Sequence, residues 1–333
     1  MKVTIKDVAL EAGVSKATVS RVLSNHPSIS DETRKKVNEV IEKMGYKPNL
    51  TARNLARSQT RTLGIIFPID ANDSFSNPIY IQMMQGISKY AQQNNYYVMY
   101  AFGKDEIEER SIKEFSSSGI VDGIVILKSE ENDKSIKYLS ETKFPFVVIG
   151  RPGEEIRALW VDNDNFGATF NITEYLIEKG YKEIGFVGAK PKWTVAKDRL
   201  EGYKRALQVH NIAYQDEWIY YGETFDEQVG IDACNQMIQG KMPQAIIATD
   251  DLIAVGIQVR LKEMGIVDIP VVGFNNTVIG QLQKPEISTV EIYGVRLGYE
   301  AARILAMQVE GNLEEPNHCI VDTQFIGRGK LKK

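Results

Sequence analysis

The sequence contains few of the residues that build metal centres, disulfides and hydrolytic active sites. Its 333 residues include only two cysteines, Cys234 and Cys319, and three histidines, at positions 26, 210 and 318. The cysteines show neither a CxxC motif nor a Cys/His spacing that could hold zinc, which favours buried, inert thiols. Three scattered histidines leave little material for a Ser/His/Asp triad or a two-histidine metal site. We therefore expect no metal, no cofactor and no hydrolytic chemistry.

The sequence also lacks a long apolar run, since no stretch approaches the roughly eighteen residues that a transmembrane helix needs. Its first residues, MKVTIKDVAL, include Asp7 and are followed by Glu11, where a secretory signal would need an uncharged apolar stretch. A composition of 43% hydrophobic and 25% charged residues is that of a globular protein, and the length allows roughly two or three domains. We expect a protein that stays in the cytoplasm and contacts no membrane.

The charge of the chain is unevenly distributed. Residues 1–61 contain 12 Lys and Arg against 6 Asp and Glu, a net of +6, whereas the remainder contains 28 against 38, a net of −10. A basic head on an acidic body suits a protein whose head alone meets a polyanion. A basic face that contacts only solvent would have the same net charge, so the residue pattern of the head must distinguish it from a face that binds a polyanion.

The head has the pattern of three short helices. Apolar residues recur at helical spacing over residues 5–12, Gly13 can take the positive φ of a tight turn, and Ser15 can cap a second helix through about Leu23. A third helix is expected over about 31–44. A helix, a tight turn and a second helix are typical of proteins that read the DNA major groove. On the second helix, Arg21 could donate two hydrogen bonds to a guanine.

A short basic segment, NLTARNLARSQTR at residues 49–61, follows the head. Its leucines are too few to fold alone. One interpretation is an ordinary linker between domains. The other is a helix that orders on DNA, enters the minor groove and wedges Leu55 between base steps, so that the duplex bends.

The acidic body alternates short apolar runs with amphipathic stretches, as βαβ units do. Expected strands are TLGIIFP, YYVMYAF, DGIVIL, FPFVVIG, EIGFVG, QAIIATD and VVGFN, and expected helices are 78–94, 164–180, 196–211, 225–240, 250–263 and 293–310. The strands fall into two groups that separate near Asp162. This predicts an α/β fold with two doubly wound halves and a ligand cleft between them; the alternative is one continuous sheet.

The body lacks the motifs of nucleotide-dependent enzymes. The segment LGIIFPIDAND has neither GxGxxG nor GxxxxGK[ST] after the first expected strand. Acidic residues at strand ends could act as general acids or as sugar ligands; these are Asp162, Asp164, Asp250 and Asp251. Without a partner base or metal, binding is the better interpretation, and we do not expect an enzyme.

Several segments carry a resemblance to a known family. TIKDVALEAGVSKATVSRVLSN, GYKPN and ARNLA in the head, with NPIYIQMMQGI, VDNDNFGA, RLEGYKRAL, ATDDLIAVG and VVGFNN in the body, resemble the LacI/GalR family of bacterial transcription regulators. The resemblance covers nearly the whole chain and is most specific in the head. It implies a three-helix helix-turn-helix domain (1–48), a hinge (49–61) and a core (62–333) similar to periplasmic sugar-binding proteins. The core's N-subdomain would hold about 62–161 and 293–320, and its C-subdomain about 162–292 and 321–333.

The resemblance also implies how DNA is bound. In the family, a homodimer reads the two half-sites of a near-palindromic double-stranded operator with its second helices. Base reading then falls to Lys16, Ala17 and Arg21, phosphate or nearby contacts to Thr18, Ser20 and Asn25, and hinge contacts to Ala52 and Leu55. Ala17 departs from the polar residue often found there, because it can touch a thymine methyl but cannot hydrogen-bond a base.

The family's effector cleft maps onto six positions, Tyr80, Trp193, Arg199, Phe225, Asp250 and Asn275, with Arg151 as a weaker candidate after the strand FVVIG. Aromatic faces cover the apolar side of a pyranose, and Arg, Asp and Asn groups bond vicinal hydroxyls. Tyr80 and Phe225 stand on helical stripes, where a core role is the alternative. Arg199 opens an expected helix, where a cation opposes the helix dipole, which favours a functional role. Asn275 stands where many relatives carry Asp.

Within the family, IGRP, WVDNDN and the tryptophan-bearing loop are most similar to the maltose-operon repressors of Gram-positive bacteria, which implies control by maltose or a related glucoside. The alternative is a catabolite-control regulator that is co-repressed by a phosphorylated carrier protein, for whose phosphate Arg303 would be available. The segment FIGRGKLKK contains no leucine heptad, so we expect a dimer rather than a tetramer.

Overall fold

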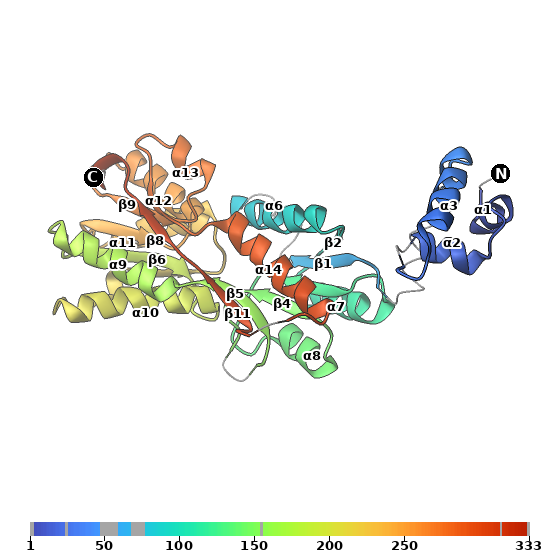
Figure 1. The fold of residues 1–333 in the computed structure, drawn as a ribbon. Coiled ribbons are helices and arrows are strands. Elements are labelled where there is room, and N and C mark those ends of the chain that lie inside the picture. The colour runs from blue at the N-terminus through green and yellow to red at the C-terminus, as the bar shows by residue number, and fades with distance from the viewer. Residues whose placement is uncertain are drawn as a thin grey trace. The chain divides into compact units, whose positions relative to one another are not determined.

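The structure, a computed structural model, describes residues 3–23, 26–46, 59–67, 77–153, 156–313 and 315–331. The chain divides into two units, Met1–Thr60 and Arg61–Lys333 (Figure 1). Among the described residues, no helix is both long enough and apolar enough to cross a membrane.

The first unit contains the three predicted helices, α1 (Ile5–Glu11), α2 (Lys16–Leu23) and α3 (Asp31–Lys43). Ser15 caps α2 as predicted, since its Oγ accepts a hydrogen bond from the Thr18 N–H at 3.1 Å. Gly13 in the turn has φ +63°, which a side chain would oppose. A small core holds the helices together; its buried members are Val8, Ala9, Ala12, Val19, Val22 and Val37.

The second unit contains two separate six-stranded sheets, which confirms two α/β halves and excludes one continuous sheet (Figure 1). The first sheet has the order β11-β5-β4-β3-β1-β2, with β1 (Thr62–Phe67), β2 (Tyr97–Phe102), β3 (Gly123–Ile126), β4 (Phe146–Ile149), β5 (Leu159–Asn163) and β11 (His318–Val321). The second has the order β12-β10-β9-β8-β6-β7, with β6 (Ile184–Ala189), β7 (Ile219–Gly222), β8 (Ala245–Ala248), β9 (Val271–Phe274), β10 (Ser288–Glu291) and β12 (Gln324–Ile326). Only β12 pairs antiparallel among these strands.

Helices cover both faces of each sheet. The first sheet has α6 (Pro78–Gln93) and α14 (Gly294–Val309) on one face, and α7 (Glu106–Ser118) and α8 (Lys134–Thr142) on the other. The second has the pair α9 (Asn165–Glu178) and α10 (Thr194–Val209) on one face, and α11 (Glu227–Met237) and α12 (Asp251–Glu263) on the other, with the short α13 (Val278–Leu282) against α12. Strands buried on both faces have the near-continuous apolar sequences expected of parallel sheets.

The chain crosses between the two subdomains three times, after β5, between β10 and α14, and between β11 and β12. A single buried side chain joins the three crossings. Asn163, at the end of β5, donates its two amide hydrogens to Ile292 O at 3.0 Å and to Val321 O at 2.9 Å. The first subdomain therefore ends at about Asn163, two residues beyond the predicted 161.

Helices α6 and α14 pack so closely that their backbones touch. A Cβ built on Gly86 would lie 1.9 Å from Val295 O, and one on Gly298 would lie 2.0 Å from Met83 O. Tyr90 and Tyr299 meet edge to face beside this crossing, with 5.4 Å between ring centroids. The two helices therefore form a rigid pair, which we call the α6/α14 pair.

Gly298→Ala should destabilise the second unit, because the new methyl group meets backbone atoms that cannot rotate away. We expect a loss of roughly 2–3 kcal/mol in unfolding free energy, typical of overpacking, measured by urea unfolding. Gly280→Ala is the matched control, since its Cβ would find its nearest neighbour at 3.4 Å, and it should be neutral or slightly stabilising. Equal midpoints for the two variants would contradict the close helix crossing.

Candidate functional site

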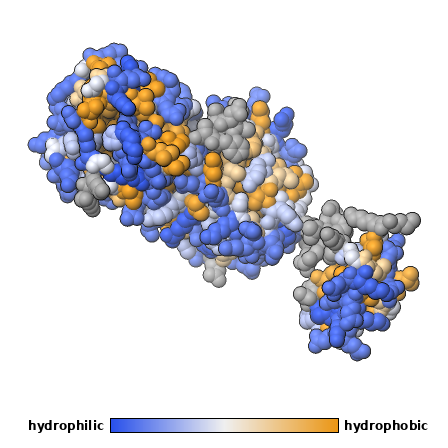
Figure 2. All heavy atoms as spheres, turned by 90° about the horizontal axis from the view of Figure 1, so that it is seen from above, coloured by the Kyte–Doolittle hydropathy of each residue, from blue (hydrophilic) through white to orange (hydrophobic). Residues whose placement is uncertain are grey.

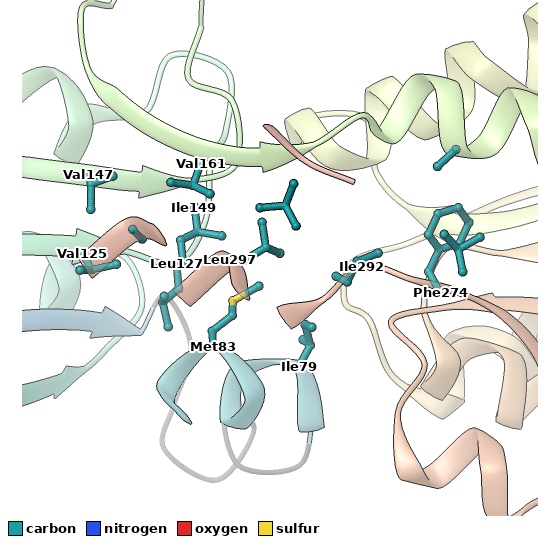
Figure 3. Close-up of a cluster of buried hydrophobic side chains, with 14 of the residues drawn as sticks. Ile79, Met83, Val125, Leu127, Val147, Ile149, Val161, Phe274, Ile292 and Leu297 are labelled. Carbon is teal, nitrogen blue, oxygen red and sulfur yellow. The ribbon is translucent and has the colours of Figure 1, made fainter. Parts of the chain in front are cut away.

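A pocket lies between the two subdomains, at the carboxyl ends of the parallel strands, where α/β proteins usually bind ligands. It contains about 720 Å³ of space, part of it open to solvent, which suits a small molecule. Its apolar side is formed by Ile79 and Met83 of α6, by Leu127, which follows β3, by Ile149 of β4 and by Leu297 of α14 (Figure 3). We call it the cleft pocket.

Six of the seven residues predicted for an effector lie around the cleft pocket; they are Tyr80, Trp193, Arg199, Phe225, Asp250 and Asn275. Arg151 is not among the lining residues. Its guanidinium lies over the Trp160 ring, 5.2 Å from the centroid, and its carbonyl accepts a hydrogen bond from Ser129 Oγ at 2.7 Å. Its positive charge nevertheless favours the ionised form of Asp162, which does line the pocket.

Asp250 is the centre of a hydrogen-bonded network that crosses the cleft. Its Oδ1 accepts from Leu252 N at 2.8 Å and so caps α12. Its Oδ2 accepts from Asn275 Nδ2 at 2.8 Å and from Asn77 Nδ2 at 3.1 Å. Since Asn77 caps α6 in the first subdomain, this carboxylate binds both halves of the core.

Arg199 is buried at the bottom of the cleft pocket, with only 4% of its surface exposed. Its Nε donates to Asn165 Oδ1 at 2.9 Å, its Nη1 donates to Thr249 O at 2.5 Å, and its guanidinium lies 4.1 Å from the Phe274 ring centroid. It stands in the second turn of α10 rather than at a helix start, because α10 begins at Thr194. The guanidinium of Arg199 therefore does not oppose the dipole at the helix start, and it needs negatively charged neighbours because it is buried.

Burial shifts the titration of the charged groups in the cleft pocket. Desolvation raises the pKa of Asp162 to about 6 and that of Asp250 to about 6, although Arg151 and Arg199 favour the ionised form of Asp162 and Arg199 favours that of Asp250. Desolvation also lowers the pKa of Arg199 to about 10, against the stabilising charges of these carboxylates. A cation and two carboxylates therefore share one space from which water is largely removed.

Three buried polar atoms at the cleft pocket lack a hydrogen-bond partner in the described parts of the chain. They are Asp162 Oδ2, Thr249 Oγ1 and Trp193 Nε1. Buried polar atoms are nearly always paired in folded proteins, so three in one pocket need an explanation. Together they offer a strong acceptor, a hydroxyl and a pure donor to a polar ligand.

An aromatic wall closes one side of the cleft pocket. Trp193, the N-cap residue of α10, meets Phe225 edge to face at 6.1 Å between centroids. Phe225 precedes α11 and does not stand on a helical stripe, because Asp226 caps that helix through the Val229 N–H at 3.1 Å. Lys128 lies 5.7 Å from the Trp193 ring and pairs with Glu108 at 2.9 Å. The wall therefore combines flat apolar faces with a cation that already has a partner.

Several polar residues of the cleft pocket were not predicted from the sequence, among them Asn77, Asn165 and Thr249. Asn77 precedes Pro78 at a helix start, which is a recognisable N-cap signal but not a ligand signal. Asn165 donates to Asp162 Oδ1 at 2.9 Å and accepts from Arg199, which is 34 residues away, so its role depends on a contact between distant parts of the chain. Thr249 simply follows the strand β8.

In the first unit, α2 presents a polar face to solvent. Its exposed residues are Lys16, Ala17, Ser20 and Arg21, while Thr18 is half-buried and holds Ser15 Oγ at 2.9 Å through its hydroxyl. The opposite face of α2 is buried through Val19 and Val22. This is the geometry of a helix that can enter a major groove. The other predicted DNA contacts, Asn25, Ala52 and Leu55, lie outside the described residues.

Comparisons with known proteins agree with both units. Residues 4–49 match the bacterial regulatory proteins of the lacI family, and residues 173–329 match the periplasmic binding protein-like domain. The HTH-type transcriptional regulator MalR of Streptococcus pneumoniae is 36% identical over 96% of both chains. Catabolite control protein A of Staphylococcus xylosus is 34% identical over 100% of both. The chain therefore belongs to the lacI family of bacterial transcription regulators, as its motifs predicted.

Solved structures show the same architecture. The complex of the transcriptional regulator CelR with cellobiose has a TM-score of 0.76 at 26% identity and covers 98% of this chain and 99% of that one. The lac repressor dimer bound to operator and the anti-inducer ONPF has a TM-score of 0.84 at 22% identity and covers 100% of both chains. The predicted combination of a helix-turn-helix unit and a periplasmic-binding-protein-like core is confirmed.

Arg199→Met should destabilise the core at neutral pH by about 3–5 kcal/mol, because it leaves the buried Asp250 carboxylate without its cation and removes one of the two cations that act on Asp162. The pKa values of Asp162 and Asp250, about 6, lie above the ordinary 3.8, so both are mostly ionised at pH 7.5 and mostly protonated at pH 5. The loss should therefore shrink as the pH falls from 7.5 to 5. Urea unfolding at both pH values measures it. Arg205→Met, at an exposed position of α10, is the control, and an equal loss at both pH values would contradict the assignment.

Proposed function

We propose that this lacI-family regulator is a cytoplasmic repressor that binds a near-palindromic operator as a homodimer, and that an uncharged glucoside such as maltose controls its operator affinity from the cleft pocket. The observation that carries the proposal is the group of three unpartnered polar atoms beside an aromatic wall. A sugar has the matching chemistry, because its hydroxyls donate and accept while its C–H face packs on aromatic rings.

The charges of the cleft pocket favour a neutral ligand over a phosphorylated one. Arg199, the buried cation, already donates to Asn165 and Thr249 and lies against the Phe274 ring. Asp162 and Asp250 would repel a phosphate placed beside them. Two solved relatives also support a glucoside, since malR of Staphylococcus is described as a maltose operon transcriptional repressor and CelR was solved with the disaccharide cellobiose.

A catabolite-control role with a phosphorylated carrier protein is the second candidate, and the similarity to catabolite control protein A supports it. Arg303, which would receive the phosphate, is half-buried on α14 and pairs with Glu300 at 2.7 Å. Its Nη1 also lies 3.1 Å from Met307 Sδ. A phosphate would have to displace Glu300, which makes this role the less favoured of the two.

The homodimer is supported by apolar side chains at the surface of the second unit. β2 is an edge strand, and Tyr97, Met99 and Tyr100 are exposed on it. Val278 and Leu282 of α13 are 57% and 72% exposed. The face in Figure 2 shows apolar patches on a mainly hydrophilic surface. Exposed apolar patches and open strand edges in a monomer usually mark an association surface.

Maltose affinity should depend on pH if a sugar hydroxyl donates to Asp162 Oδ2. In the acid form of Asp162 the proton lies on Oδ2, because Oδ1 already accepts from Asn163 N and Asn165 Nδ2. With a pKa of about 6 in the free protein, that proton must leave before Oδ2 can accept, so the dissociation constant should rise about tenfold from pH 7.5 to pH 5. Isothermal titration calorimetry measures it. Asp162→Asn should bind maltose more weakly at pH 7.5 and show a smaller pH dependence. No maltose binding at any pH would exclude this effector.

Arg21→Ala should reduce affinity for an operator selected from random DNA by about 1–3 kcal/mol and relax the base preference at one position of each half-site. Lys35→Ala on α3 is the control, at another exposed cation of the same unit, and should at most lower affinity uniformly and weaken its salt dependence. Fluorescence anisotropy on a panel of operator variants separates the two. An unchanged base preference in Arg21→Ala would remove this residue from base reading.

A further inference from the structure

Arg61 is held by the core through an unusually complete set of contacts. Its Nη1 donates to Glu310 Oε1 at 2.7 Å, and its Nη2 donates to Asn94 O at 2.6 Å. Its guanidinium lies over the Tyr96 ring, 4.1 Å from the centroid, and the Tyr96 hydroxyl donates to Glu310 Oε1 at 3.1 Å. One arginine thus joins the chain at residues 94–96 to Glu310, which is more than 200 residues away.

The backbone of Arg61 is fixed as well. Its N–H donates to Asp122 Oδ2 at 2.7 Å, and its carbonyl accepts from Tyr97 N at 2.7 Å. Its φ is +53°, a left-handed conformation that a residue with a side chain adopts only when its surroundings hold it there. Both the position and the direction of the chain are therefore set at the first residue of the second unit.

The side-chain partners of Arg61 lie at the ends of two helices that begin at the cleft pocket. Asn94 is the C-cap of α6 and Glu310 is the C-cap of α14. At the other end of α6, Asn77 binds Asp250, and near the start of α14, Leu297 lines the pocket. Each helix has 16 residues and is therefore about 24 Å long.

The α6/α14 pair has little freedom to bend or slide. Gly86 and Gly298 bring the two backbones into direct contact, so the helices cannot shift past each other without opening this crossing. A displacement at the pocket end of the pair must then appear at the end that Arg61 holds. Bistable or rigid packed elements of this kind are the physical basis of coupling between distant sites.

We propose that Arg61 is the positioning residue that couples the cleft pocket to DNA binding, because it clamps the far ends of α6 and α14 to the residue at which the DNA-binding unit is joined to the core. The proposal rests on the proposed function, a repressor whose operator affinity a pocket ligand controls. It adds the element that transmits the signal. No base, phosphate or effector contact is assigned to Arg61.

A structural ion pair and a coupling clamp predict different results for Arg61→Ala. The Arg61 and Glu310 side chains are 33% and 37% exposed, and such pairs contribute little to stability. A merely structural role would therefore leave both stability and regulation nearly unchanged. A clamp would leave the maltose affinity of the pocket unchanged and abolish the effect of maltose on DNA binding.

The test measures operator affinity by fluorescence anisotropy with and without saturating maltose, using the full chain. In wild type the ratio of the two dissociation constants should lie between about 5 and 150, and in Arg61→Ala it should fall to about 1. Glu310→Gln, which weakens the same contact from the helix side, should give an intermediate ratio. Arg260→Ala removes an Arg–Glu pair of similar exposure on α12 and should keep the wild-type ratio. A wild-type ratio in Arg61→Ala would overturn the proposal.

A second measurement separates failure of the clamp from failure of the proposed effector. Hydrogen–deuterium exchange of the segment 59–63 should be faster in Arg61→Ala than in wild type or Arg260→Ala, with exchange in β3 unchanged. If maltose does not alter operator binding by wild type, maltose is not the effector. The exchange rate of the segment 59–63 then tests whether Arg61 holds this segment to the core. Wild-type exchange at 59–63 in Arg61→Ala would then overturn it.

Discussion

The core depends on the attraction between opposite charges that are buried together in the cleft pocket, where little water can reach them. The Arg199 guanidinium has no water layer to screen it, and its pKa and those of Asp162 and Asp250 are displaced in the directions that desolvation requires. Each group is tolerable only because the others are present. The amides of Asn77, Asn165 and Asn275 fill the remaining positions between them. Charge burial thus defines where the two subdomains meet and what chemistry a ligand finds there.

Helix starts strengthen this arrangement. Asn77, Asp250 and Trp193 occupy the N-cap positions of α6, α12 and α10, and all three line the cleft pocket. The partial positive charge at a helix N-terminus stabilises nearby carboxylates, which offsets part of the cost of burying them. Parallel strands that end at one edge, with each following helix starting there, produce this convergence automatically. The location of the pocket is therefore a property of the topology, whereas its selectivity depends on individual side chains.

Much of this organisation could be predicted from the sequence, because it rests on local signals. Ser15 predicted the start of α2, and the apolar runs predicted the central strands that are buried on both faces. Asp250 was found because an acidic residue directly follows such a run, and Asn275 was found through the resemblance to the lacI family. The short strands β5, β7, β10, β11 and β12 were missed, since three to five residues are too few for a clear period, and β11 pairs with β5 across more than 150 residues of chain. Arg151 does not line the pocket and lies over the Trp160 ring, although its charge acts on Asp162, which does line it.

Asn163 has a consequence for how the halves of the core can move. One amide satisfies carbonyls on the other two crossings, so the three connections cannot separate without leaving buried backbone groups unpaired. Relative motion of the subdomains is thereby restricted to rotation about an axis close to this side chain, with the largest excursions at the points most remote from it. The molecule has in effect one pivot, and sliding of one lobe along the other is suppressed.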